Sequence, residues 1–366
     1  MKSLFLIISS FLISTVLSLT FTSTGKFTIV QFTDLHCGSD SNLDSQTTEL
    51  QRKILAWVQP DFVIITGDAA AAMPNTPGTF EKTWQKFTAP MLEAQIPYAY
   101  TLGNHDTEGD LNNPQIVELD QSNHISIRKE SEGIAGTANF RVPVYASKNI
   151  SQLAAHLWIF DSGAHDCEGN SDSYGCIEKN VITWYDEESL RIKKQHGENI
   201  THLAFYHIPI PEYIEVYNNQ EIYGMANERV HCSLVNTGFF KHVRKNGDIS
   251  SMYVGHDHDN DFGGWYQDVE FVYGRKTGYS SYGNKHGARV IVLTEEYDKE
   301  GNLMVSREHY VIDENGEIQD TSSTRIRGGS KQCSCPNLNE DDTFFLWKFF
   351  INLIRGIIQW FSNLFN

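Results

Sequence analysis

The sequence carries little positive charge. Its 366 residues include 29 Lys and Arg against 46 Asp and Glu, which gives a formal net charge of -17. A nucleic-acid binder needs a broad basic surface for its phosphate contacts, so this composition argues against nucleic acid as a partner. An anionic substrate would have to be drawn by local positive charge, such as that of metal ions.

The apolar run near the N-terminus is short. Lys2 precedes a run from Leu4 to Leu17, about 14 residues, whereas a membrane span needs about 20. A basic residue, an apolar stretch and then Ser18 are typical of a secretory signal. We predict that residues 1–18 form a signal peptide, with a signal anchor as the alternative. The protein would then enter the secretory pathway and be secreted, lie in the endolysosomal lumen, or sit on the outer membrane surface.

Cysteine is scarce as well, with six in the chain. In an oxidising compartment some of the six should form disulfides. Cys167 and Cys176 flank a loop-like stretch and are the best candidate pair. The pairing of the other four stays open: Cys37, Cys232, Cys333 and Cys335. Whether the fold brings Cys37 and Cys232 together is part of this open question.

Two sequons also favour entry into the secretory pathway. Asn149 begins Asn-Ile-Ser and Asn199 begins Asn-Ile-Thr, which are acceptor sequences for N-glycosylation. We therefore expect both asparagines to lie on the surface and to carry glycans.

In the first hundred residues, apolar strands repeatedly end at polar side chains. Residues 26–33, 61–66 and 96–102 are rich in β-branched and aromatic residues and are predicted strands. Amphipathic helices are predicted between them, at 44–58 and 80–94. This β-α-β-α-β order indicates an α/β fold with largely parallel strands, in which ligands gather beyond the carboxyl ends of the strands.

The later sequence continues the pattern with less regularity. Residues 109–142 are polar and are predicted to form an irregular loop over the site. Predicted strands are 156–160, 201–206, 251–254, 269–273, 288–293 and 303–312, the last two as a hairpin, and predicted helices are 183–194 and 238–245. No internal repeat is present, and residues 313–343 have the composition of a polar linker.

The strand ends supply seven oxygen or nitrogen donors. Imidazole with carboxylate suits Zn, Mn or Fe rather than Ca. Seven donors are more than one tetrahedral ion can bind. They suit two ions about 3.5–4 Å apart that share a carboxylate. Any one of these residues, a lone His207 above all, would more often be structural, so the argument depends on the set. The donors are Asp34, His36, Asp68, Asn104, His207, His256 and His258.

These motifs resemble those of the calcineurin-like metallophosphoesterases. The matching residues are Asp34-Leu-His36, Gly67-Asp68, Gly103-Asn-His-Asp106, His207 and Gly255-His-Asp-His258. Residues 203–213, 236–240 and 255–262, with Tyr279 and Tyr282-Gly283, are similar to one branch of that superfamily. The branch holds the fungal dosage-dependent cell-cycle regulator phosphatase and small plant purple-acid-phosphatase-like proteins. The resemblance covers about residues 26–312.

The resemblance implies a fold, a cofactor and residue roles. The fold would be a four-layer α/β/β/α sandwich, holding two divalent ions. His105 would be the general acid that protonates the leaving group, with Asp106 orienting it, and a metal-bridging hydroxide would attack phosphorus in line. The first metal would be held by Asp34, His36, Asp68 and His258, and the second by Asn104, His207 and His256, with Asp68 bridging.

Two departures from related families qualify these roles. Purple acid phosphatases have a tyrosinate where this chain has Ala71, and a glycine where it has His36, so we expect no purple charge-transfer band. Protein phosphatases of the calcineurin type have an arginine soon after the bridging aspartate, whereas this chain has alanines at 69–72. Assignment as a protein phosphatase is therefore not supported.

The C-terminal residues 344–366 are strongly apolar. Their polar residues recur at alternating steps of four and three, which predicts an amphipathic helix with a wide apolar face. We favour an anchor lying in the plane of a membrane surface. The alternatives are a cleaved lipid-anchor signal, a true span, or packing on the domain itself.

The sequence thus predicts a secreted or luminal two-metal phosphatase that acts on phosphate monoesters. A phosphodiesterase or nucleotide pyrophosphohydrolase is the alternative within the same chemistry. A membrane-recruited binding protein with an inactive site is the alternative of another class.

Overall fold

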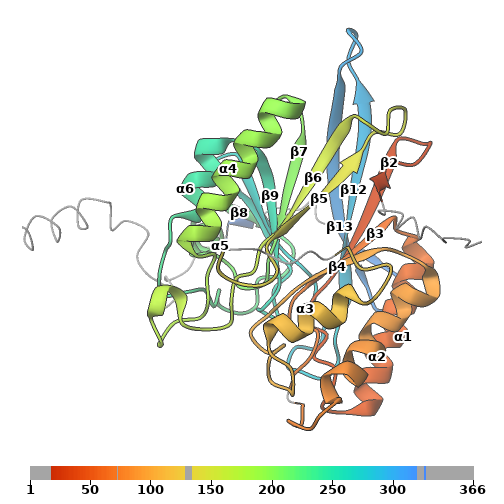
Figure 1. The fold of residues 1–366 in the computed structure, drawn as a ribbon, viewed down its shortest axis with the longest axis vertical. Helices are drawn as coiled ribbons and strands as arrows, with labels where there is room; N and C mark the ends of the chain where they lie inside the picture. Colours follow the sequence, from red (N-terminus) through yellow and green to blue (C-terminus); the bar gives the residue numbers. More distant parts are fainter. Residues whose placement is uncertain (1–17, 72, 128–133, 320–324, 327–366) are drawn as a thin grey trace, which may run out of the picture.

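In the computed structural model, residues 18–71, 73–127, 134–319 and 325–326 are described, and they fold as two β-sheets flanked by helices (Figure 1). Residues 1–17 of the predicted signal peptide and the apolar tail 344–366 lie outside this part of the chain. Within the described residues, no helix has the length and apolar character needed to cross a membrane.

One sheet has six strands and supplies half of the site. Its three strands β2, β3 and β4 run parallel, so their carboxyl ends lie at the same edge. β12 and β13 form the predicted antiparallel hairpin. In spatial order the strands are β14 (Ile318–Gln319), β13 (Leu303–Asp313), β12 (Gly287–Tyr297), β2 (Lys26–Phe32), β3 (Phe62–Thr66) and β4 (Tyr98–Thr101).

The second sheet has nine strands and supplies the other half. Its central strands β6, β7, β9 and β11 are parallel to one another. In spatial order the strands are β1 (Leu19–Thr20), β5 (Phe140–Tyr145), β6 (Leu153–Ile159), β7 (Thr201–Phe205), β9 (Ile249–Val254), β11 (Val269–Tyr273), β10 (Gly263–Tyr266), β8 (Glu221–Tyr223) and β15 (Arg325–Ile326).

Alternating side chains along β2 explain why the sheets pack face to face. Phe27 and Ile29 belong to the core between the two sheets, whereas Val30 and Phe32 belong to the core under the helices. Because successive side chains of a strand point to opposite faces, a strand that is apolar on both faces must be covered on both. β2 is therefore an interior strand of a layered fold.

The helices form the two outer layers. α1 (Ser41–Val58) and α2 (Thr79–Ala94) share a core with the six-stranded sheet, through Ile54 and Phe87 among others. On the nine-stranded sheet, α4 (Lys179–His196), α5 (Glu212–Asn219) and α6 (Phe239–Asn246) play the same part. The arrangement confirms the predicted four-layer α/β/β/α sandwich.

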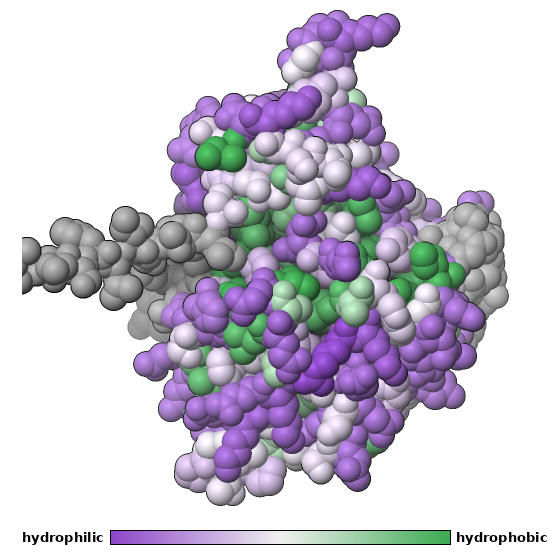
Figure 2. All heavy atoms as spheres, turned by 90° about the vertical axis from the view of Figure 1, so that its right-hand side faces the viewer, coloured by the Kyte–Doolittle hydropathy of each residue, from purple (hydrophilic) through white to green (hydrophobic). Residues whose placement is uncertain are grey.

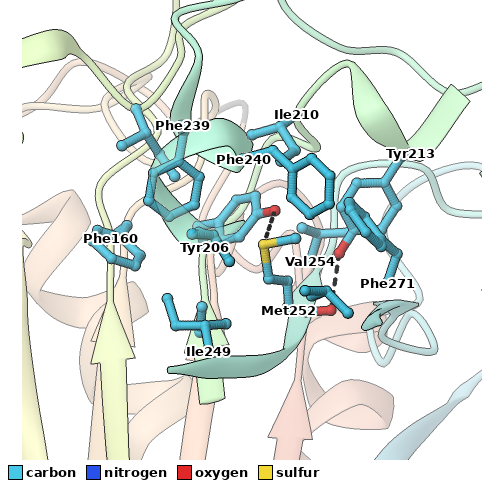
Figure 3. Close-up of a cluster of buried hydrophobic side chains, with 14 of the residues drawn as sticks. Phe160, Tyr206, Ile210, Tyr213, Phe239, Phe240, Ile249, Met252, Val254 and Phe271 are labelled. Atoms are coloured by element: carbon cyan, nitrogen blue, oxygen red, sulfur yellow. Dashed lines mark hydrogen bonds between the residues drawn. The ribbon is translucent and has the colours of Figure 1, made fainter. Parts of the chain in front are cut away.

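Figure 3 shows the core beneath α5 and α6. Phe239 and Phe240 of α6 and Tyr213 of α5 pack over strands β9 and β11. The Tyr213 hydroxyl donates a 2.9 Å hydrogen bond to the carbonyl of Met252, so its polar atom is satisfied inside an apolar cluster. The outer surface differs: the face in Figure 2 is mostly hydrophilic, with hydrophobic residues gathered mainly in a band across its middle.

The start and end of α1 follow from its sequence. The Asp40 carboxylate accepts hydrogen bonds from the amides of Asn42 and Leu43, which are among the unpaired donors of the first turn. Gln59 adopts a left-handed conformation after the last turn, and Pro60 follows it. The predicted stop at Pro60 is confirmed.

Two stretches differ from the sequence-based expectation. Residues 109–142 are not an irregular loop throughout, because they contain α3 (Asn113–Gln121) and the start of β5. Only Ile116 and Val117 of α3 supply buried apolar side chains, too few to show a periodicity. Residues 313–343 are not wholly a linker, since β14 pairs with β13 and β15 pairs with β8. The sequence reading also missed β1, β8, β10, α5 and the short 3₁₀ turn η1 (Cys167–Gly169).

Candidate metal centre

Loops at the carboxyl ends of both sheets bring the seven predicted donors together. The six-stranded sheet contributes the residues after β2, β3 and β4, and the nine-stranded sheet contributes those after β7 and β9. Each donor residue is at most 8% exposed, which is unusual for carboxylates and imidazoles without a partner. They are Asp34, His36, Asp68, Asn104, His207, His256 and His258.

The donors form two groups that share one carboxylate. Asp34, His36, Asp68 and His258 make the first group, and within it one ligand atom per residue lies within 4.8 Å of the others. The second group, Asp68, His207 and His256, meets the same condition. Asn104 joins the second group, because its Oδ1 lies 3.2 Å from His207 Nε2. Asp68 is therefore placed to bridge two ions.

The spacing within the first group fits a metal ion. A tetrahedral site with ligands at about 2.0–2.2 Å has ligand–ligand edges of about 3.4 Å. His36 Nε2 lies 3.1 Å from His258 Nε2 and 3.7 Å from Asp68 Oδ2. His258 Nε2 lies 3.5 Å from Asp34 Oδ1. Two imidazole nitrogens aimed at each other and flanked by carboxylates suit a shared cation.

The backbone at these loops is in an uncommon conformation. Asp34, His36, Asp68 and His256 have φ values of 53°, 48°, 48° and 78°. Left-handed conformations at residues other than glycine cost free energy and gather at functional sites. Here they turn the chain sharply in the loops that follow β2, β3 and β9.

Gly103, which directly precedes Asn104 in the loop after β4, permits close packing. A Cβ atom on Gly103 would lie 2.2 Å from Asp68 Oδ1, so no larger residue fits there without moving the shared carboxylate. The Gly-Asn sequence thus combines close approach at the first residue with a candidate metal donor at the second.

The groups shift one another's proton affinity. Burial alone would raise the pKa of Asp68, but the imidazoles of His207 and His36 outweigh it and hold that pKa well below its usual range. Burial acts to lower the pKa of His207, yet the Asp68 and Asp34 carboxylates raise it to about 10. Burial lowers the pKa of His256 to about 4. The centre therefore holds negative charge that binds either a proton or a metal ion.

His105 stands beside the centre rather than in it. Its side chain is 39% exposed, and its ring centroid lies 5.2 Å from that of His36. Its amide donates to Asp68 Oδ1 at 2.8 Å, which ties the residue to the bridging carboxylate. His105 Nδ1 lies 2.8 Å from Glu108 Oε1, so the other nitrogen, Nε2, is the one left for a substrate.

The family model for calcineurin-like phosphoesterases matches residues 27–298. The chain belongs to this family. The probable inactive purple acid phosphatase 28 of Arabidopsis thaliana is 31% identical over 75% of this chain and 76% of its own length. Phosphatase DCR2 of Saccharomyces cerevisiae is 26% identical over 66% of this chain and 45% of its own length.

A solved structure supports the fold. A dimetal phosphatase from Danio rerio superposes with a TM-score of 0.50 at 12% identity, covering 77% of this chain and 98% of that one. At this identity the likeness bears on the fold alone. The predicted family and fold are both confirmed.

Asp106 has a different place from the one expected for this calcineurin-like site. Its fully buried carboxylate accepts hydrogen bonds from the backbone amides of Asp68, Ala70 and Gly103, at 2.7 to 2.9 Å. Both oxygens are used in this way, and the His105 ring pairs with a different carboxylate. Burial, with the nearby Asp68, raises the pKa of Asp106 to about 6. The expectation that Asp106 orients His105 is wrong, and Glu108 occupies that position instead.

Residues around the donor histidines contact them or their neighbours in the sequence. Sequence patterns alone did not identify these contacting residues. Tyr282 stacks on His258 with ring centroids 4.1 Å apart, and its hydroxyl donates to Glu228. Asp257 accepts from the hydroxyl of Tyr273 and lies 2.7 Å from His231 Nδ1. In the sequence, Tyr282 appears only as part of the family motif, and the other residues carry no signal beyond residue type.

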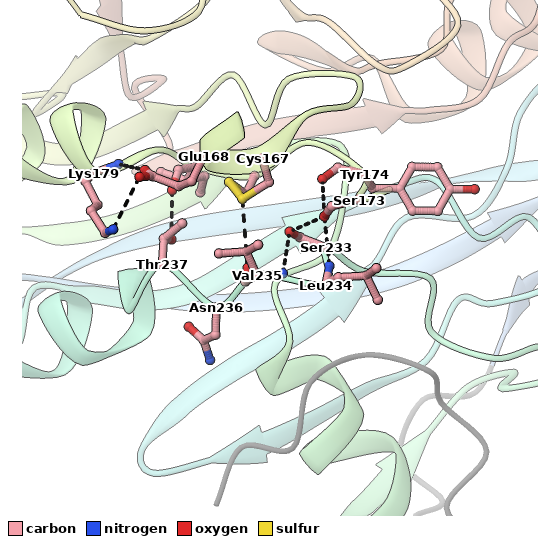
Figure 4. The surroundings of a disulfide bond; sticks show 12 residues. Cys167, Glu168, Ser173, Tyr174, Lys179, Ser233, Leu234, Val235, Asn236 and Thr237 are labelled. Carbon is pink, nitrogen blue, oxygen red and sulfur yellow. Dashed lines mark hydrogen bonds and ion pairs between the residues drawn. A yellow bond between two sulfur atoms is a disulfide. The ribbon is translucent and has the colours of Figure 1, made fainter. Parts of the chain in front are cut away.

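The disulfide loop also reaches this centre. Cys167 and Cys176 are bonded, which confirms the predicted pair (Figure 4). Cys37 is a buried free thiol, so a Cys37–Cys232 bridge does not form, and Cys232 is itself disulfide-bonded. Within the loop, Tyr174 packs edge-on against His256, with ring centroids 4.7 Å apart.

The predicted sequons lie away from the centre. Asn149 and Asn199 are both exposed, as a glycosylated asparagine must be. Their surface position is confirmed, and their glycosylation remains a prediction.

Proposed function

We propose that this protein hydrolyses phosphate monoesters at a centre of two divalent metal ions. The observation that carries the proposal is the pair of donor groups that share Asp68, next to an exposed His105 that belongs to neither. The metals would then act on the phosphoryl group and the attacking water, and His105 would act on the leaving group.

Charge favours a phosphate dianion. Among the seven donors only Asp34 and Asp68 are anionic, so two divalent ions would leave about two positive charges at the centre. Bound there, the ions would neutralise charge on the phosphoryl group and lower the pKa of a water molecule. Zn, Mn and Fe all suit imidazole with carboxylate, and the neutral Asn104 keeps the net charge positive.

The chain's own residues supply the proton. His105, held through Nδ1 by Glu108, would keep a proton at Nε2 and give it to the leaving alkoxide. Its partial exposure leaves room for the leaving group of a substrate. Asp106 supports this arrangement indirectly, because it fixes the amides of Asp68 and Gly103.

Two alternatives are tested by the same assay. A phosphodiesterase or pyrophosphohydrolase would use the same metals. The Arabidopsis relative named as probably inactive favours the second alternative, a binding protein with an inactive site. The complete set of seven buried donors supports an enzyme instead.

The proposal includes a place in the cell. An exported protein can keep the Cys167–Cys176 disulfide, which a reducing cytosol would not favour. The predicted signal at residues 1–18 and glycans on Asn149 and Asn199 agree with a secreted or luminal protein. Residues 344–366, outside the described part, would hold it at a membrane surface, and their deletion should release it from vesicles in a flotation assay.

The deciding experiment compares two esters. The metal-loaded protein should turn over p-nitrophenyl phosphate faster than bis(p-nitrophenyl) phosphate. His105→Ala should lower kcat for phenyl phosphate, whose leaving group needs a proton, about 100-fold without loss of metal. His124→Ala removes an exposed histidine outside the centre and serves as the control.

Three results would count against the proposal. No turnover of either ester by a metal-loaded protein contradicts the enzyme and favours the binding protein. Preference for the diester favours the phosphodiesterase. Unchanged monoester turnover in His105→Ala contradicts the acid role while leaving the metals in place.

A further inference from the structure

The loop closed by the Cys167–Cys176 disulfide places an aromatic hydroxyl at the rim of the metal centre. Tyr174 contacts His256 edge-on, at 4.7 Å between ring centroids and 83° between ring planes. His256 belongs to the second donor group. Burial raises the pKa of the Tyr174 hydroxyl, and the carboxylates of Asp257 and the bridging Asp68 raise it further. The Tyr174 ring therefore lies at the edge of the centre.

This hydroxyl has no partner in the described part of the chain. The other tyrosines around the centre use theirs: Tyr273 donates to Asp257, Tyr279 to Glu314 and Tyr282 to Glu228. Figure 4 shows the Tyr174 ring extending away from the disulfide, with no interaction drawn at its oxygen. A half-buried hydroxyl that has no partner among the described residues, beside a centre that two metal ions would make cationic, is a donor available to an anion.

The loop around Tyr174 is built to hold it in place. Ser173 Oγ donates to the Tyr174 carbonyl at 2.7 Å and lies 2.9 Å from Ser233 Oγ. The Leu234 amide donates back to Ser173 Oγ. His165 stacks on the Tyr174 ring and pairs with it as an antiparallel bridge. With the disulfide, these contacts order the side chain before any substrate arrives.

We propose that Tyr174 is a substrate-binding residue whose hydroxyl donates a hydrogen bond to a phosphoryl oxygen of the bound phosphate ester. The inference rests on the proposed function, because it takes the phosphate to lie at the two-metal centre. The disulfide then has a role in substrate binding, since it closes the loop that carries Tyr174. The phosphoryl group would be held from three directions: by the metals, by His105 at the leaving group, and by Tyr174 on the side of His256.

The test is a substitution that keeps the ring and removes the oxygen. Tyr174→Phe should weaken binding of inorganic phosphate to the metal-loaded protein by about 10- to 100-fold, the range expected for a hydrogen bond to a charged group. Calorimetric titration measures this without turnover. KM for p-nitrophenyl phosphate should rise with it, and metal content should not change. Tyr297→Phe, at the far end of β12 and 37% exposed, is the matched control.

A second variant tests the loop. Cys167→Ser with Cys176→Ser should weaken phosphate binding in the same direction and leave the metals bound. Wild-type affinity in Tyr174→Phe overturns the proposal. So does metal loss in that variant, because Tyr174 would then only support His256.

The experiments distinguish failure of the proposed function from failure of the role proposed for Tyr174. A protein that binds metals and phosphate but hydrolyses no ester contradicts the proposed function, while the phosphate affinities of the variants still decide the role of Tyr174. A metal-loaded wild-type protein that binds no phosphate overturns both.

Discussion

Three carboxylates of the loops after β3 and β4 have separate tasks at this centre. Asp68 faces both donor groups, Asp106 accepts backbone amides of the turns, and Glu108 faces the exposed His105. The difference comes from burial and from the available partners, because the three side chains have the same chemistry. Role at the residue scale is thus set by the burial and the partners of each carboxylate.

Glu108 is the residue whose role is most open to test. Glu108→Gln keeps the shape of the side chain but removes the charge that pairs with His105 Nδ1. We expect kcat to fall about tenfold for a phenyl phosphate, whose leaving group needs a proton. The loss should be smaller for p-nitrophenyl phosphate, whose leaving group needs less help.

A matched control separates orientation from general damage. Glu118→Gln changes an exposed glutamate of α3 and should leave both rates unaltered. Equal losses for both esters in Glu108→Gln would mean that Glu108 does not act through proton transfer.

At the scale of elements, the centre depends on short turns after strands. Four metal donors have positive φ, and Gly103 lies where a Cβ atom would meet Asp68. These strained turns persist because β2, β3, β4 and β9 are fixed in two packed sheets. The strands therefore set the geometry, and the loops carry the chemistry.

Gly103→Ala tests this dependence on close packing. The new methyl group would displace the Asp68 carboxylate, which belongs to both donor groups. We expect bound metal to fall from two ions per chain to one or none, and kcat to fall at least about 100-fold. Metal analysis by mass spectrometry measures the first effect.

Gly109→Ala is the control for that substitution. Its Cβ would meet the end of the flexible Met73 side chain at 2.9 Å, which can move at little cost. Full metal content in Gly103→Ala would show that the turn tolerates a side chain and that the packing argument is mistaken.

The sequence predicted the strand ends well and the intervening segments poorly. All seven candidate donors can be predicted because each follows an apolar strand, a pattern that local sequence records. α3 was missed because it buries few apolar side chains. Glu108 and Tyr174 could not be found by pattern, since their roles depend on contacts with His105 and His256 that only the folded chain creates.

At the scale of the whole molecule, an ionic contact joins the two sheets. Glu270 of β11 pairs with Arg307 and His309 of β13, at 2.8 and 3.2 Å. Burial alone would raise the pKa of Glu270, but His309 and Arg307 outweigh it and lower the pKa from 4.5 to about 2. Burial lowers the pKa of His309, so Arg307 is the partner that stays charged at neutral pH.

This contact predicts a pH dependence of stability. Because the pKa of Glu270 is lower in the folded state, its contribution is complete above the unfolded value near 4.5 and is lost as the pH falls toward about 2. Glu270→Gln should lower the free energy of unfolding at pH 7 by roughly 2–3 kcal/mol. Urea denaturation at pH 7 and pH 4 should show a smaller pH effect in the variant than in the wild type.

The control for Glu270 is Glu300, an exposed glutamate with no ion pair among the described residues. Glu300→Gln alters an exposed residue in the turn between β12 and β13. It should change neither the free energy of unfolding at pH 7 nor its dependence on pH. If wild type and Glu270→Gln lose the same free energy of unfolding between pH 7 and pH 4, the acid sensitivity comes from other residues.

The central claim is that two donor groups sharing Asp68 hold two metal ions. The most direct measurement is the metal stoichiometry of the purified protein and of Asp68→Asn, by mass spectrometry after metal loading and desalting. The account predicts two ions per chain in the wild type and at most one in Asp68→Asn. A wild-type protein that retains no ion, or an Asp68→Asn variant that retains two, would contradict it.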